Sequence, residues 1–151
     1  MHLHLEKHIL GEGHVDLTEE GKTAKGMADT IISKGLRDLS EIWGSEVVLF
    51  YPGLYAGQTD LVGTYDYEDS IIDFKSSNKM QRREWIEDYF LQLGAYAMAH
   101  NQVYGTQITQ GVILMCTPEM QFQKFQIKGQ KFIDYLHQFL AKVDQYYKMF
   151  K

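Results

Sequence analysis

The chain has 151 residues, of which 44% are hydrophobic and 23% charged, and its formal net charge of −5 argues against non-specific coating of nucleic acid. This length is typical of one domain with a substantial core. No apolar run approaches the roughly 20 residues that a membrane span requires, and we recognise no leader peptide. The single cysteine, Cys116, excludes an internal disulfide, a four-cysteine zinc site and an iron–sulfur cluster held by cysteines of this chain.

The first half of the chain predicts two helices followed by three strands. Residues 1–10 begin inside a helical pattern without a cap, so we expect a single domain, 1–151, that lacks an N-terminal segment. A loop over 11–21 leads to a helix from about Thr23 to Trp43, because apolar residues recur there at helical spacing. Three strands with short turns between them predict an antiparallel meander; they cover 46–51, 55–66 and 70–76.

The second half predicts a helix, two strands and a final helix. A basic connection over 79–83 precedes a long helix over about 83–104. An apolar strand over 109–117 and an alternating, half-exposed edge strand over 122–127 follow. From Gly129 onward the chain predicts an amphipathic helix whose core side carries Phe132, Ile133, Leu136, Phe139, Leu140 and Val143. The order of elements predicts an α/β (α+β) fold, with a mixed sheet of about five strands and helices on both faces.

Charged residues on the third predicted strand are the strongest indication of a site. Side chains alternate along a strand, so Ile72 and Phe74 face one side while Asp73 and Lys75 face the other. Burying two charged groups beside so apolar a strand is costly unless they are used or paired. Asp60, at the start of the preceding strand-like run, adds a second carboxylate.

Two carboxylates beside a lysine are suited to hold a hard divalent cation and a water next to a phosphodiester. The alternative is an Asp73–Lys75 pair that only neutralises its own charges. Charge along the chain supports the first interpretation: residues 1–73 carry 14 acidic and 5 basic side chains, and residues 74–151 carry 6 acidic and 10 basic ones. An acidic half can concentrate metal ions, and a basic half can receive phosphates.

Four motifs occur in order along the chain: a histidine four residues before a glutamate (His2 and Glu6), Gly-x-x-Asp ending at Asp60, Asp73-Phe74-Lys75, and Gln92-x-x-x-Tyr96. Together they resemble the RecB-like branch of the PD-(D/E)XK nuclease superfamily, in particular the family of the mitochondrial genome maintenance exonuclease and its bacterial and phage relatives. The likeness is continuous from about Gly57 to Cys116. It implies a restriction-endonuclease-like core and a metal-dependent deoxyribonuclease. It also implies no iron–sulfur cluster, because the relatives that hold one need several cysteines.

The resemblance implies a metal site and one residue that supports it. Asp60, Asp73, the Phe74 carbonyl and His2 would bind Mg²⁺ or Mn²⁺, and Glu6 would orient His2 or a metal-bound water.

Three further residues would act on the substrate. Lys75 would orient the attacking water and stabilise charge on the phosphoryl oxygens, and it could act as a base only if its pKa were lowered. Gln92 would position a metal-bound water or a phosphate. Tyr96 would contact the DNA backbone or pack against the catalytic strand.

The expected substrate is single-stranded DNA with free ends, bound through the phosphate contacts of Lys79, Arg82 and Arg83. The resemblance implies an exonuclease in replication, recombination or repair, with replication or recombination proteins as partners. Its expected location is the cytoplasm of a bacterium or a phage-infected cell, away from membranes. Two alternatives stay open: a structure-specific or restriction-type endonuclease, and a nucleic-acid-binding module that has lost catalysis.

Overall fold

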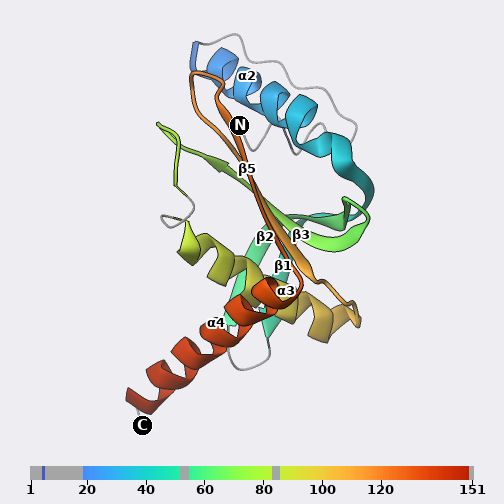
Figure 1. Cartoon of the computed structure of the whole chain (residues 1–151), viewed down its shortest axis with the longest axis vertical. Coiled ribbons are helices and arrows are strands. Elements are labelled where there is room, and N and C mark those ends of the chain that lie inside the picture. Colours follow the sequence, from blue (N-terminus) through green and yellow to red (C-terminus); the bar gives the residue numbers. More distant parts are fainter. Residues whose placement is uncertain (1–4, 6–18, 52–54, 83–85, 150–151) are drawn as a thin grey trace.

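The computed structural model describes residues 19–51, 55–82 and 86–149, together with Leu5. It contains a five-stranded mixed sheet with helices on both faces (Figure 1). The elements follow in the order α2 (Glu19–Lys34), the short 3-10 helix η1 (Leu36–Asp38), β1 (Leu39–Tyr51), β2 (Tyr55–Tyr65), β3 (Glu68–Ser76), α3 (Glu87–Tyr104), β4 (Gln110–Cys116), β5 (Phe122–Lys128) and α4 (Gln130–Met149). This architecture confirms the predicted fold class and is consistent with a restriction-endonuclease-like core.

The sheet has the strand order β1-β2-β3-β4-β5. The first three strands pair antiparallel, which confirms the predicted meander. The pairing of β3 with β4 is parallel, so the chain must cross from one end of the sheet to the other, and α3 makes that crossover. The final pair, β4 and β5, is antiparallel and places β5 at an edge, as predicted. The central strand is therefore β3.

The two faces of the sheet bury two separate apolar clusters. Ile72 and Phe74 pack with the α2 residues Met27 and Ile31 on one face. On the other face, Ile71 lies in the cluster formed with α3 and α4. This alternation confirms that Ile72 and Phe74 share a face and leaves Asp73 and Lys75 on the side of α3.

The predicted helix from Thr23 to Trp43 was wrong beyond residue 34. Leu36, Leu39 and Ile42 recur at helical spacing, but α2 ends at Lys34, and β1 begins at Leu39, opposite Tyr65 of β2. Pairing with β2 outweighs the local helical pattern, since each strand residue gains a hydrogen-bonded partner and packing on the sheet. Ile42 is 43% exposed rather than part of a core stripe.

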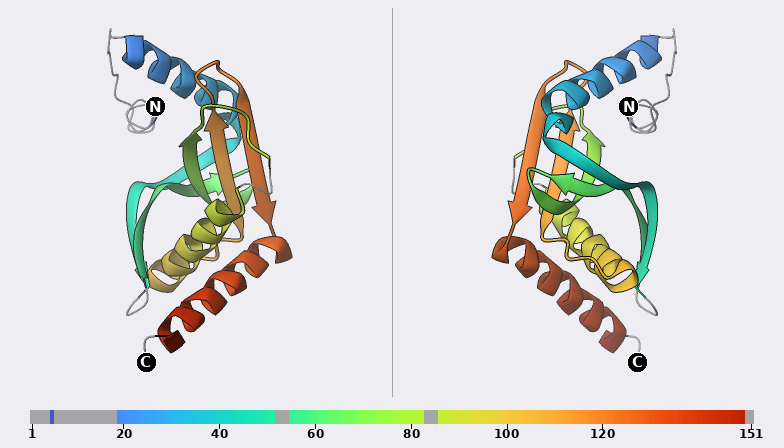
Figure 2. Two further views of the ribbon diagram at one scale, coloured as in Figure 1. Left: turned by 90° about the vertical axis from the view of Figure 1, so that its left-hand side faces the viewer. Right: turned by 90° about the vertical axis from the view of Figure 1, so that its right-hand side faces the viewer.

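The later elements agree with the prediction except on α4. Among the described residues α3 begins at Glu87, and β4 and β5 lie within one residue of their predicted bounds. On α4, Phe132 is buried, but Ile133 is 37% exposed and was wrongly assigned to the core side. Much of α4 extends past the sheet (Figure 2). No helix in the described ranges combines the length and hydrophobicity that crossing a bilayer requires.

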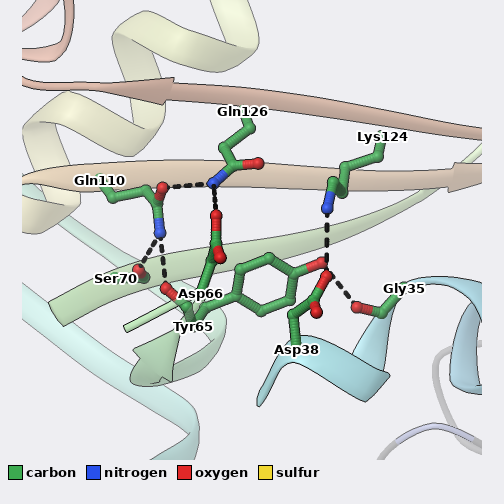
Figure 3. Close-up of polar contacts among 8 residues, drawn as sticks. All are labelled: Gly35, Asp38, Tyr65, Asp66, Ser70, Gln110, Lys124 and Gln126. Carbon is green, nitrogen blue, oxygen red and sulfur yellow. Dashed lines mark hydrogen bonds and ion pairs between the residues drawn. The ribbon is translucent and has the colours of Figure 1, made fainter. Parts of the chain in front are cut away.

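A buried polar network ties the β2–β3 turn to its neighbours (Figure 3). Asp66 and Tyr67 form the turn with φ values of 49° and 65°, the left-handed backbone of a tight hairpin. The Asp66 carboxylate accepts a hydrogen bond from Gln126 Nε2 at 3.1 Å, and the side chain of Gln110 donates to the Tyr65 carbonyl and to Ser70 Oγ. These bonds fix the hairpin that carries the predicted acidic residues.

Replacing Tyr65 by phenylalanine should lower the free energy of unfolding by about 1–2 kcal/mol. The Tyr65 hydroxyl donates to the Gly35 carbonyl at 2.6 Å, and both residues are buried, so the variant deprives a buried carbonyl of this donor. Urea unfolding measures the effect. The matched control is Tyr67→Phe, which removes the hydroxyl of a residue that is 94% exposed and should leave stability unchanged. Equal stability of both variants would contradict the assigned role of the Tyr65 hydroxyl.

Candidate active site

Asp60 and Asp73 meet across the β2–β3 ladder. The register pairs Leu61 with Ile72, so the next position along the ladder sets Asp60 opposite Asp73. Asp60 Oδ2 accepts a hydrogen bond from the Phe74 backbone N–H at 2.8 Å. The negative charge of Asp60 also opposes the ionisation of Asp73, so the two carboxyl groups influence each other across the hairpin. The hairpin thus brings together the two acidic residues that the sequence predicted.

Lys75 completes the cluster from the same strand. Its Nζ lies 2.7 Å from Asp73 Oδ2, and the two side chains are 26% and 11% exposed. The ring of Tyr89, on α3, lies over the ammonium at 4.7 Å from Nζ to the ring centroid. Tyr89 lies in the first turn of α3 and is 39% exposed, and Lys75 beneath it keeps part of its side chain exposed, whereas Asp73 is buried.

Electrostatics in the cluster raise the pKa of Asp73 and keep Lys75 charged. Burial, followed by the hydrogen bond and charge of Asp60, raises the pKa of Asp73 to about 7, although Lys75 acts in the opposite direction. Burial acts to lower the pKa of Lys75, but the hydrogen bond and charge of Asp73, with Tyr89 and Asp60, outweigh it and raise the pKa. Lys75 is therefore protonated at neutral pH, which suits it to stabilise negative charge rather than to act as a base.

The raised pKa of Asp73 predicts that the metal-free protein loses stability as the pH rises through about 7. The folded carboxyl keeps its proton between its unfolded pKa of about 4 and about 7, so the folded state binds more protons in this window. This contribution to stability is therefore complete below about pH 4 and is lost above about pH 7.

Asp60→Asn should flatten this pH dependence. The substitution removes the negative charge nearest Asp73 yet keeps a side-chain oxygen that can accept the Phe74 N–H, so the pKa of Asp73 should fall. Denaturant unfolding in chelator, from about pH 5 to pH 8, measures the change in the free energy of unfolding. An identical pH slope in the two proteins would show that Asp60 does not control Asp73.

Gln92 and Tyr96 lie together on the exposed side of α3. Gln92 Nε2 donates to the Tyr96 hydroxyl at 2.9 Å, and both side chains line a cavity that α4 closes on its far side. Tyr89, Gln92 and Tyr96 are spaced by three and four residues and so follow one face of the helix, with Tyr89 at the end that covers Lys75. The predicted pair thus lies on the same helix as Tyr89, one and two turns farther along it.

Lys79 and Arg82 are exposed on the segment that leaves β3. This segment is fastened to the edge strand, because Gln81 N–H donates to Gln123 Oε1 and Gln123 Nε2 donates back to the Gln81 carbonyl, both at 2.8 Å. The two basic side chains are therefore presented to solvent just past the carboxyl end of β3. The predicted site residues His2, Glu6 and Arg83 lie outside the described residues.

The oxygen donors fit a hard divalent cation. Among the described residues, no group of three or more His, Cys, Asp or Glu side chains is placed to hold a metal. Asp60 and Asp73 are nevertheless enough for Mg²⁺, which is usually held by one or two carboxylates with water and substrate phosphate completing its shell. A cation could also replace the proton that the crowded Asp60–Asp73 pair retains near neutral pH.

Sequence reasoning assigned no site role to the α4 residues that face Gln92 and Tyr96. Phe139 and Lys142 are three residues apart and therefore on one side of α4, and both line the cavity beside α3. Phe139 belonged to the predicted core side, where it is half-buried. In the sequence, this part of the cavity lining was indicated only by Lys142, which lies at the border of the apolar face of α4.

Comparison with known proteins shows a shared fold without a sequence match. No family model and no curated protein matches the chain. The solved structure of the "Putative exonuclease" of Eubacterium rectale superposes with a TM-score of 0.60 and 15% sequence identity, over 95% of this chain and 62% of that protein. An alkaline exonuclease of Laribacter hongkongensis gives a TM-score of 0.36 and 12% identity, over 97% of this chain and 78% of that one. The chain thus has the fold of the Eubacterium protein and spans less than two thirds of its length.

Proposed function

We propose that this chain is the catalytic domain of a divalent-metal-dependent deoxyribonuclease. The observation that carries the proposal is the convergence of Asp60, Asp73 and Lys75, from the two strands of one hairpin, into a single half-buried cluster. The shared fold with a protein named as an exonuclease supports it. A buried ion pair that only neutralised its own charges would not require Asp60, whose carboxylate opposes the ionisation of Asp73.

In the proposed reaction Asp60 and Asp73 would hold Mg²⁺ or Mn²⁺ together with the Phe74 carbonyl and His2, and Glu6 would orient His2 or a metal-bound water. When bound, such a cation polarises the scissile phosphate and lowers the pKa of a coordinated water. Lys75 then donates hydrogen bonds to the phosphoryl oxygens, where negative charge develops. Its contacts with Asp73 and Tyr89 hold the ammonium in place before the substrate arrives.

The substrate we propose is single-stranded DNA, degraded from free ends by an enzyme of the RecB-like branch that resembles the mitochondrial genome maintenance exonuclease. The support is the set of four motifs, which includes the Gln92 and Tyr96 pair on the helix beside the cluster. Lys79, Arg82 and Arg83 would bind phosphates of the strand, and this contribution should weaken as salt increases. The enzyme would act with replication, recombination or repair proteins in the cytoplasm of a bacterium or a phage-infected cell.

Linear and circular single-stranded DNA of equal length provide the test. We expect Mg²⁺ or Mn²⁺ to support degradation of the linear strand, chelator to stop it, and the circle to persist because it has no end. Products are followed on gels with either end labelled, which also gives the direction of digestion. Cleavage of the circle would assign an endonuclease instead. DNA binding without cleavage in either metal would assign a module that has lost catalysis.

A further inference from the structure

A cavity of about 370 Å³ lies between α3 and α4, within the size range of small-ligand sites. Its apolar surface comes from Leu91 and Ala95 of α3 and Phe139 of α4. Its polar lining consists of the Gln92–Tyr96 pair and of Lys142 with Asp88. Apolar walls with a few polar groups at the edge are typical of a site for a flat, partly polar molecule.

The cavity is lined by the same helix, α3, that carries Tyr89. Tyr89 covers the Lys75 ammonium, and Gln92 and Tyr96 follow on the same helix face. With a rise of 1.5 Å per residue, these two side chains lie about 5 and 10 Å farther along the helix axis. A DNA strand with its phosphate at Lys75 would therefore bring a neighbouring nucleotide to the cavity.

The chemistry of the lining matches a nucleobase better than a phosphate or an acyl chain. Aromatic side chains stack on bases of any sequence, and Phe139 offers a half-buried ring for this purpose. An amide beside a phenol can both donate to and accept from the polar edge of any base. Lys142 is 63% exposed, and its Nζ is 4.0 Å from Asp88 Oδ1, a weak pairing that a phosphate at the rim can replace.

We propose that this cavity binds the unstacked base of a nucleotide adjacent to the scissile phosphate, an inference that rests on the nuclease function proposed above. The base enters between Tyr96 and Phe139, with its edge at Gln92 and its own phosphate near Lys142. A base that is paired and stacked in a duplex cannot enter. Because only an unpaired base can enter the cavity, this binding site would give the enzyme its proposed preference for single-stranded DNA.

Abasic substrates test the inference with the unaltered protein. Linear oligonucleotides are made with a tetrahydrofuran residue in place of one nucleoside, at successive positions from the cleaved end. We expect KM to rise about tenfold at one position, with kcat nearly unchanged, because one base–aromatic stack is lost. The other positions should behave as the intact strand. A KM that does not depend on the position of the abasic residue would overturn the proposal.

A variant confirms where the base binds. Phe139→Ala should raise KM on the intact strand to the level of the sensitive abasic strand and should have no further effect on that abasic strand. Leu140→Ala, a half-buried neighbour on α4 that does not line the cavity, is the control and should match the wild type. Equal effects of Phe139→Ala on both strands would refute base binding there. Absence of any cleavage by the wild type would instead refute the nuclease function itself, and this inference with it.

Discussion

Asp73→Asn should reduce metal-dependent DNA cleavage by at least about a thousandfold while the protein stays folded. The substitution removes the charge that would hold the cation together with Asp60 and that fixes the Lys75 ammonium at 2.7 Å. An amide of the same shape replaces a carboxyl whose pKa is raised to about 7, so the variant should be as stable as the wild type, or more stable, at about pH 8. Lost activity with retained stability is the expected signature of a functional residue.

Degradation of linear single-stranded DNA and thermal unfolding, both at about pH 8, measure the two effects. The matched control is Asp69→Asn, on the same strand and half-buried, which should keep nearly full activity. Lys75→Ala should lose a comparable share of activity, because Lys75 supplies the positive charge beside the proposed phosphate position. Asp73→Asn with near-normal cleavage would remove the basis of the proposed active site.

Gly63→Ala should lower the free energy of unfolding by about 3 kcal/mol, the largest stability effect that we expect from a single methyl group. A Cβ on Gly63 would lie 2.0 Å from the carbonyl oxygen of Glu41 and 3.1 Å from the Ile42 Cα. Both are backbone atoms of β1, at the irregular part of its pairing with β2, so β1 itself would have to move. A flexible side chain could yield to the methyl group, but a paired strand cannot do so without losing hydrogen bonds.

Urea unfolding compares this variant with Gly105→Ala, the matched control. A methyl group on Gly105 would meet no heavy atom within 4 Å, but the φ of 68° at this residue disfavours alanine by about 1 kcal/mol. The two variants thus separate a steric clash from backbone strain. If Gly63→Ala were no less stable than Gly105→Ala, then β1 would not approach β2 as closely as the structure shows.

The features that depend on residues close together in the sequence could be predicted from the sequence alone. The alternation of Ile72, Asp73, Phe74 and Lys75 predicted both faces of β3, because the side-chain period of a strand is independent of what packs on it. The short turn between β2 and β3 brings Asp60 to Asp73 through a local hairpin, so their proximity was also predictable.

Features that depend on distant pairing or on helix docking were not predictable. The start of β1 at Leu39 is decided by its pairing with Tyr65, while the local apolar spacing favours a helix. The cavity beside Gln92 depends on how α4 crosses α3. That crossing is close at Gly94, where a Cβ would lie 3.2 Å from the Leu136 backbone nitrogen. A single glycine such as Gly94 within a helical pattern does not predict which segment packs against it.

The hairpin origin of the acidic pair also bears on the order of folding events. Strands β2 and β3 are joined by a two-residue turn and can pair early, while both carboxylates are still hydrated. We expect the dehydration of Asp73 to follow later, when the crossover helix α3 packs on the sheet. If the free-energy cost of burying the Asp73 carboxylate arises after the transition state, it increases the unfolding rate and leaves the folding rate unchanged. Neutralising Asp73 should therefore lengthen the lifetime of the folded protein without making it fold faster.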